Sequence, residues 1–280
     1  AFNNMNLSPK EVSNVDMGYI FEEILRKFSE STNESAGEHY TPRSIVKLCV
    51  ELAIGLDDEL TGDEDIKKIY DPTCGTGGIL TVAEEVLKEL HGDMLTELYG
   101  QELNPESYAI AKADLLLKGY DSSRITLGST LSDDKLEGLV ADYIIANPPY
   151  GTSWKNDEAF VKNEAKTLGF DGRFGAGTPS VSDGQLLFLQ HMISKMNPNG
   201  ARLAVVHNGS PLTNGDAGSG ESEIRKWIIE NDWLDAIVQM PNNLFYNTGI
   251  QTYVWLLTNR KTKDRQNKVQ LIDASSDRFW

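Results

Sequence analysis

Residues 71–78 read Asp-Pro-Thr-Cys-Gly-Thr-Gly-Gly, and they connect a short apolar run at 66–71 to a helical pattern of apolar residues at 79–90. Glycines at such a strand-to-helix turn let the backbone come close to a ligand at the positive end of a helix. The turn therefore predicts a site for a carboxylate or phosphate group, although similar turns often only connect a strand to a helix. No lysine follows the glycines, so the segment is not a Walker motif.

Short apolar runs alternate with helical patterns along the rest of the chain. Strands are predicted at residues 66–71, 98–103, 125–128, 142–146, 201–207, 234–240 and 252–258. Seven strands with interleaved helices predict an α/β fold with a doubly wound, mostly parallel sheet, which is a Rossmann-like arrangement. Only residues 241–251 separate the last two strands, so we expect these two to pair antiparallel and one strand of the sheet to be reversed.

Four further segments lie outside the regular alternation of strands and helices. Two amphipathic helices are predicted near the start of the chain, at residues 21–28 and 45–52, with a polar loop between them. The glycine-rich segment 169–177 is predicted to be a mobile loop that could close on DNA. The run at 269–272 looks like a strand, but the chain offers it no later partner.

Composition limits the class of protein. With 280 residues and 40% apolar composition, the chain can bury the core of one large α/β domain, with or without pieces of a second one. No apolar run of about 18 residues and no secretory signal occur, which indicates a cytoplasmic protein outside the membrane. Cys49 and Cys74 are too few for a disulfide framework or a zinc site, and we expect two packed thiols.

The charge balance argues against unaided DNA binding. The chain has 42 acidic and 26 basic residues, a net charge of −16, which should repel a polyanion. Either the protein does not bind nucleic acid, or a partner supplies most of the phosphate contacts.

Two polar residues follow later predicted strands. Glu102 ends the second strand, where an acidic side chain can accept hydrogen bonds from both hydroxyls of a ribose. Asn147 begins the sequence Asn-Pro-Pro-Tyr after the fourth strand. An aryl amine is a poor nucleophile, and two acceptors that take both of its N–H protons push electron density toward a methyl donor. The Asn147 side-chain oxygen and the Pro148 carbonyl are such acceptors, and Pro148 and Pro149 hold them in an extended conformation.

Together these motifs resemble those of amino-methylating DNA methyltransferases. The resemblance implies S-adenosylmethionine as cofactor, a class I methyltransferase fold, and direct in-line transfer that requires neither a nucleophilic residue nor a metal. It also assigns roles to residues. The methionine end of the cofactor would be held by Asp71, Thr73, Gly75, Thr76 and Gly77, and Tyr40 and Thr41 would close over it. Glu102 would hold the ribose, and Asn147 would also contact the cofactor.

Two parts of this assignment are weaker than the rest. Thr41 and Pro42 also fit an ordinary helix start, with Thr41 as the N-cap and Pro42 at the first helical position. After the third strand, Ser129 stands where related enzymes often place an aspartate that binds the amino group of the cofactor's adenine. A serine oxygen is the weaker acceptor of the two, so recognition of that adenine is the least secure part of the predicted site.

The substrate base must leave the DNA duplex to reach such a site, at a cost of a few kcal/mol. Tyr150 offers a flat face on which the base could stack, and Phe245, with Tyr246 behind it, is a second candidate. The ordinary alternative is that these aromatics are core residues under a loop.

Nearly the whole chain resembles the methylation subunit of type I restriction-modification systems, an N6-adenine DNA methyltransferase family. The segments 182–191, 218–225 and 243–250 carry this finer resemblance. It implies double-stranded DNA as substrate, a specificity subunit and a second methylation subunit as partners, and a nuclease-translocase subunit that can be added. Delegated target recognition would explain the acidic balance. The implied domains are 1–36, the end of a helical N-terminal domain, 37–262, the catalytic domain, and 263–280, the start of a C-terminal extension.

Two other functions remain open from the residues. Glutamine methyltransferases that act on release factors also carry Asn-Pro-Pro-Tyr, because a carboxamide nitrogen presents the same chemical problem as an aryl amine. The alternative that is not an enzyme is a scaffold that binds the cofactor and a partner but transfers no methyl group. Ser129, which departs from the family pattern, favours this alternative slightly.

Overall fold

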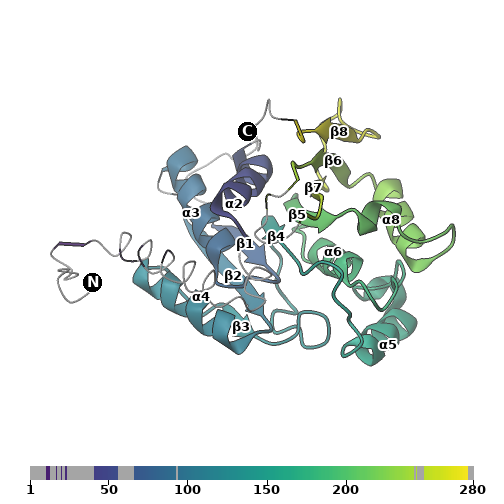
Figure 1. Ribbon diagram of the computed structural model, residues 1–280, viewed down its shortest axis with the longest axis horizontal. Coiled ribbons are helices and arrows are strands. Elements are labelled where there is room, and N and C mark those ends of the chain that lie inside the picture. Colours follow the sequence, from purple (N-terminus) through teal and green to yellow (C-terminus); the bar gives the residue numbers. More distant parts are fainter. Residues whose placement is uncertain are drawn as a thin grey trace.

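In a computed structural model of the chain, the structure describes residues 41–55, 66–92, 94–242, 244 and 249–276, with the single residues 11, 12, 17, 20 and 23. One sheet of eight strands runs through this part in the order β3-β2-β1-β4-β5-β7-β6-β8 (Figure 1). The strands are β1 (Lys67–Asp71), β2 (Thr96–Glu102), β3 (Ile125–Leu127), β4 (Tyr143–Ala146), β5 (Arg202–Asn208), β6 (Leu234–Gln239), β7 (Thr252–Thr258) and β8 (Gln270–Asp273). The helices are α2 (Arg43–Val50), η3 (Glu51–Gly55), α3 (Gly78–His91), α4 (Pro105–Leu117), α5 (Glu158–Leu168), η4 (Gly169–Asp171), α6 (Gln185–Ser194), α7 (Ser210–Thr213) and α8 (Gly220–Glu230).

The predicted fold class is confirmed. Strands β1 to β5 are parallel, and β7 is the one reversed strand, because it runs antiparallel to both of its neighbours, β5 and β6. The sheet has an eighth strand, because the run at 269–272 pairs in parallel with β6, which comes earlier in the chain. Strand β8 lies within 263–280 and forms an edge of the same sheet.

Period-two alternation explains how the sheet is covered on both faces. On β4, Tyr143 and Ile145 join the core cluster beneath α2 and α3, whereas Ile144 joins the cluster beneath α6 and α8. Strand β5 alternates in the same way. Figure 1 shows these helices as two layers with the sheet between them. No described helix combines the length and the apolar character that a membrane crossing requires.

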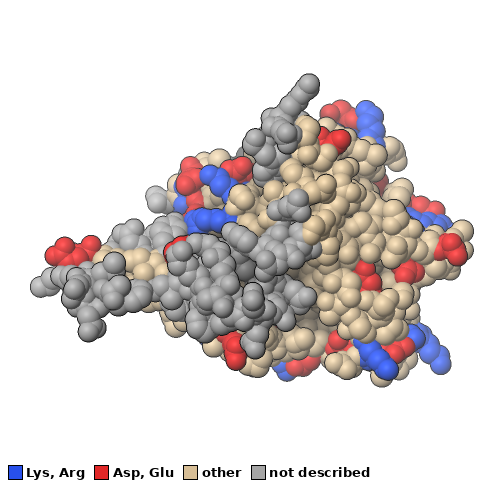
Figure 2. Space-filling view, viewed as in Figure 1, with Lys and Arg blue, Asp and Glu red and all other residues tan. Residues whose placement is uncertain are grey.

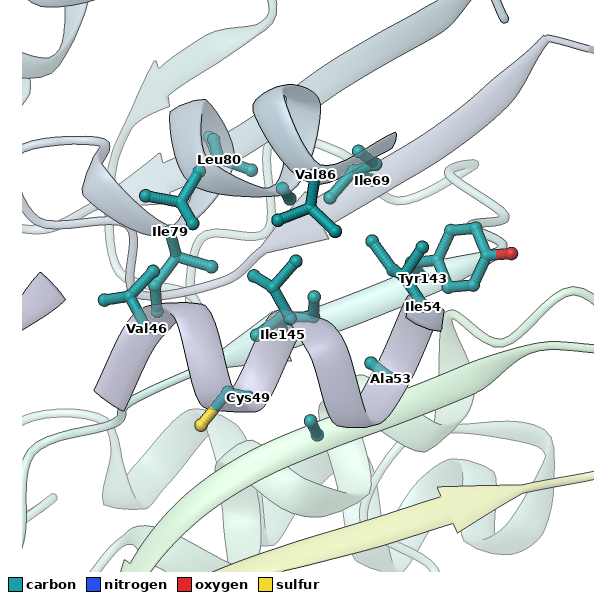
Figure 3. Close-up of a cluster of buried hydrophobic side chains, with 14 of the residues drawn as sticks. Val46, Cys49, Ala53, Ile54, Ile69, Ile79, Leu80, Val86, Tyr143 and Ile145 are labelled. Carbon is teal, nitrogen blue, oxygen red and sulfur yellow. The ribbon is translucent and has the colours of Figure 1, made fainter. Parts of the chain in front are cut away.

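The predicted helix at 45–52 is part of a longer helical segment formed by α2 and η3. Its buried side chains join the core cluster shared with α3 and the strands, and Figure 3 shows Val46 beside Ile79 and Ile54 beside Tyr143. Burial raises the pKa of the Cys49 thiol to about 12, so the thiol is neutral and packed. Both cysteines are free and buried, as expected.

The segment 169–177 differs from the mobile loop that its glycines predict. Phe174 is fully buried, in a small cluster that includes Leu131 and Trp154. Arg173 pairs with Glu164 of α5 at 2.6 Å and also donates to the carbonyl oxygens of residues 130 and 131, at 2.8 and 2.9 Å. Composition does not indicate these contacts, because it counts the glycines but not the anchoring role of one arginine and one phenylalanine.

A buried histidine extends this anchor into the sheet. Burial lowers the pKa of His191 to about 3, so its ring is neutral. Arg173 donates to Nδ1 of the ring at 3.2 Å, which leaves the hydrogen on Nε2, and Nε2 then donates to the hydroxyl of Tyr70 on β1 at 2.9 Å.

Replacing Arg173 with alanine should lower the free energy of unfolding by about 3–5 kcal/mol, because the buried Glu164 carboxylate would lose its partner. Chemical denaturation measures the change. Lys162→Ala, which breaks an exposed pair with Glu158 on the same helix, is the control and should change stability by no more than about 1 kcal/mol. A similar small loss for both variants would show that Arg173 does not anchor the segment.

Candidate active site

A cavity of about 560 Å³ opens at the carboxyl ends of four neighbouring parallel strands. Asp71 ends β1, Glu102 ends β2, Ser129 follows β3 and Asn147 follows β4, and all four residues line the cavity. Ligands of doubly wound sheets bind at this edge, where the loops leave the strands. The sequence motifs, which lie far apart in the chain, therefore meet in one place.

Asp71 is the most buried acid of the cavity, with 1% of its surface exposed. Its Oδ1 accepts a hydrogen bond from the backbone N–H of Thr73 at 2.9 Å. Its Oδ2 has no hydrogen-bond partner in the described part of the chain. Burial raises the pKa of this carboxyl from 3.8 to about 8. A cationic group beside Oδ2 would supply the missing partner and favour the ionised form.

The glycine turn adopts conformations that require glycine. Gly75 has φ +53° and Gly77 has φ +86°, both in the left-handed region. A side chain at Gly77 would also place its Cβ 3.4 Å from the Cβ of Ala111 on α4. The turn leads directly into α3, whose first residue follows Gly77. Thr73, Gly75 and Thr76 line the cavity, whereas Gly77 supports the turn from behind.

Glu102 joins the turn to the second strand. Its Oε2 accepts from the backbone N–H of Gly75 at 2.8 Å, and its Oε1 accepts from the backbone N–H of Asn104 at 2.7 Å. Each oxygen keeps further acceptor capacity, because a carboxylate oxygen has two lone pairs. Glu102 can thus hold two hydroxyls of a ligand and fix the glycine turn at the same time.

Asn147 is held on both sides. Its Nδ2 donates to the Thr41 hydroxyl at 2.9 Å, and its Oδ1 accepts from the Tyr150 hydroxyl. Thr41 therefore contacts the asparagine and lines the cavity, while Pro42 is the N-cap of α2, which corrects the predicted helix start by one residue. The Pro148 carbonyl accepts no hydrogen bond from the described residues.

The side chain of Tyr150 packs against the core behind Asn147 and does not line the cavity. Pro149 lines the cavity, whereas Pro148 and Tyr150 do not, and the ring of Tyr150 packs against the core cluster beneath α2. Burial raises the pKa of its hydroxyl. The stacking role of Tyr150 stays a prediction and would require its side chain to turn. Tyr40 was predicted to cover the methionine moiety and Phe245 to stack on the target base. Both lie outside the described residues.

Two further residues of the cavity wall were not predicted from the sequence. Trp154 is almost fully buried beside the cavity, and its indole N–H donates to the carbonyl of Ser180 at 2.8 Å. Asp157 also lines the cavity and accepts from the Ser129 hydroxyl at 2.8 Å. Only an aspartate before a helical pattern could have pointed to Asp157, and that signal predicts a helix cap rather than a ligand.

The donor and acceptor set fits S-adenosylmethionine. That molecule carries an ammonium and a sulfonium charge, and the unpartnered Oδ2 of Asp71 offers a counter-charge in a buried place. Glu102 offers acceptors for ribose hydroxyls from the adjacent strand. Asn147 follows β4, which pairs with β1 on the side away from β2, and a second substrate could approach there.

Comparisons with known proteins agree with this site. Residues 12–279 match the model of a family described as N-6 DNA Methylase. The chain is 34% identical over 264 residues to the type I restriction enzyme MjaIX methylase subunit of Methanocaldococcus jannaschii, covering 92% of this chain and 44% of that protein. It is 30% identical over 262 residues to the HindI methylase subunit of Haemophilus influenzae, covering 92% of this chain and 54% of that protein.

A solved structure is similar in both sequence and fold. The type I restriction-modification methyltransferase subunit of Streptococcus thermophilus superposes with a TM-score of 0.76 at 28% identity, covering 93% of this chain and 52% of that one. The chain thus spans about half the length of the relatives it matches.

Proposed function

The chain belongs to the N-6 DNA methylase family, and we propose that it transfers the methyl group of S-adenosylmethionine to the exocyclic N6 of adenine in double-stranded DNA. We propose further that it acts as the modification subunit of a type I restriction-modification complex. The observation that carries the proposal is the meeting of Asp71, Glu102 and Asn147 at one cavity, each at the end of a neighbouring strand.

The chain's own residues would hold and polarise the two reactants. The cofactor supplies an activated methyl group that can be transferred without a covalent intermediate on the protein. Asp71 would hold its methionine end and Glu102 its ribose, and the glycine turn lets the backbone approach it. The Asn147 side-chain oxygen and the Pro148 carbonyl, which has no donor among the described residues, would accept hydrogen bonds from the two N–H groups of the target amine, which makes its nitrogen a better nucleophile. Asn147 Oδ1 accepts from the Tyr150 hydroxyl and keeps a second lone pair for a hydrogen bond from the amine.

Charge supports a division of labour in binding DNA. The net charge is −16, and Figure 2 shows the charged side chains of one face mainly along its outline, without a continuous basic patch among the described residues. Phosphate contacts normally supply much of the affinity for DNA. We therefore propose that a specificity subunit carries most of these contacts, with a second methylation subunit and, where present, a nuclease subunit in the same complex.

The substrate class is tested by offering both candidates to the protein. Methyl-labelled S-adenosylmethionine is incubated with the chain and its specificity subunit, together with duplex DNA or a release-factor protein. Label is expected on DNA only. Label on a glutamine of the protein would favour the alternative enzyme, and label on neither, with cofactor binding intact, would favour a scaffold.

Cofactor binding should release a proton at neutral pH. The pKa of Asp71 is raised to about 8 in the ligand-free chain, so the carboxyl is mostly protonated at pH 7. A bound cation lowers that pKa, and the proton leaves. Affinity for S-adenosylmethionine should therefore increase as the pH rises from about 6 toward about 8.

Calorimetry at pH 7 in buffers of different ionisation enthalpy measures the proton released. Asp71→Asn should remove this release and weaken binding, whereas Asp264→Asn, at an exposed position, should leave both unchanged. Equal proton release by the wild type and the Asp71 variant would contradict the assignment.

A further inference from the structure

Asp157 occupies the N-cap position of α5 but does not cap that helix. At this position an aspartate ordinarily accepts a hydrogen bond from an N–H of the first helical turn. Its side chain makes no such bond. Instead, Oδ1 accepts from the hydroxyls of Ser129, at 2.8 Å, and Ser132. The carboxylate is therefore turned away from its own helix and toward the loop that follows β3.

The position of this carboxylate follows from the order of the strands. The sheet runs β3-β2-β1, so the loop after β3 lies next to Glu102 on the side away from Asp71. Ser129 and Asp157 line the same cavity as these two acids. A ligand whose cationic end lies at Asp71 and whose ribose lies at Glu102 would extend its base toward Asp157.

The Asp157 carboxylate has acceptor capacity left. Both serine hydroxyls donate to Oδ1, and Oδ2 receives no donor from the described residues. In that part of the chain no lysine or arginine forms an ion pair with Asp157 either. Ser129 already donates its one proton to the carboxylate. The stronger free acceptor at this end of the cavity is therefore the aspartate and not the serine that the sequence pattern singles out.

We propose that Asp157 selects the adenine ring of the cofactor by accepting a hydrogen bond from its exocyclic amine, with Ser129 and Ser132 as positioning residues that hold the carboxylate. This inference rests on the proposed function, because it assigns the base of the proposed cofactor to one end of the cavity. A carboxylate contributed by the start of α5 thereby takes the place of the aspartate that is absent at residue 129.

The test is a comparison of two nucleoside ligands that differ at one group. S-adenosylhomocysteine carries an amine at the six-position of its base, and S-inosylhomocysteine carries a carbonyl oxygen there. Two acceptors would face each other in the second case, so the wild-type chain should prefer the adenosyl ligand by about 100-fold in Kd. In Asp157→Asn the amide N–H can donate to the carbonyl, so the preference should fall to within about 5-fold, with tighter inosyl binding than in the wild type.

Glu158→Gln is the matched control, because Glu158 is the next carboxylate at the same helix start and does not line the cavity. It should keep the wild-type preference. Ser129→Ala should reduce the preference less than Asp157→Asn does. A gain in inosyl affinity cannot come from damage to the fold, which keeps the test valid if the variant is less stable.

The inference is overturned if Asp157→Asn keeps the wild-type preference, or if Ser129→Ala alone abolishes it. Either result, with tight binding of S-adenosylhomocysteine, leaves the proposed function standing. If the wild-type chain binds neither ligand, the proposed function fails and the inference fails with it.

Discussion

Asn147→Ala should slow methyl transfer to DNA by about 100-fold or more, the effect of removing one oriented group that stabilises a transition state. Asn147 lines the cavity, and two neighbours fix its side chain, because its Nδ2 donates to the Thr41 hydroxyl and its Oδ1 accepts from the Tyr150 hydroxyl. Alanine removes the acceptor and leaves the rest of the cavity in place. Single-turnover rates with bound DNA and cofactor measure the chemical step directly.

Two further variants separate chemistry from structure. Asn147→Asp keeps an acceptor oxygen and should lose less activity than Asn147→Ala. Asn199→Ala, an exposed asparagine outside the cavity, should keep the wild-type rate. Turnover by Asn147→Ala at the wild-type rate would exclude the proposed mechanism.

Glu102→Ala should weaken binding of S-adenosylmethionine by about 100-fold or more, because hydrogen bonds to a charged group contribute roughly 1.5–3 kcal/mol each. Glu102 would make two such bonds to the ribose, and it also fixes the glycine turn through the N–H of Gly75. Equilibrium dialysis or calorimetry measures the change in Kd.

Glu97→Ala is the control for this experiment. Glu97 lies on the same strand and pairs with Arg124, but it does not line the cavity. Its loss should leave the Kd within about 2-fold, since effects of distant sites are usually independent. Equal affinities for the wild type and the Glu102 variant would show that the ligand does not lie across the ends of β1 and β2.

The residues at strand ends could be predicted from the sequence. Asp71, Glu102 and Asn147 each follow an apolar run, and parallel strands bring their carboxyl ends to one edge of the sheet. The strand pattern therefore fixes their neighbourhood without knowledge of any contact. Reversal of β7 was predictable for a similar reason, since the segment before it is too short for a crossover.

The rest depends on tertiary contacts that no local pattern reports. Asp157 reaches Ser129 across 28 positions of the chain, and its own neighbourhood predicts only a helix cap. The side chain of Tyr150 could turn toward or away from the cavity, and packing against the core decides between the two. Strand β8 pairs in parallel with β6 and not with its neighbour in the chain, β7, so its partner comes earlier in the sequence and not later.

The most direct measurement of the central claim is the identity of the methylated nucleoside. Duplex DNA is treated with methyl-labelled S-adenosylmethionine and the protein, with and without its specificity subunit, and is then digested to nucleosides. The label should appear on N6 of adenine, and only when the specificity subunit is present. Label on another base, or none on DNA while the cofactor still binds, would contradict the proposed function.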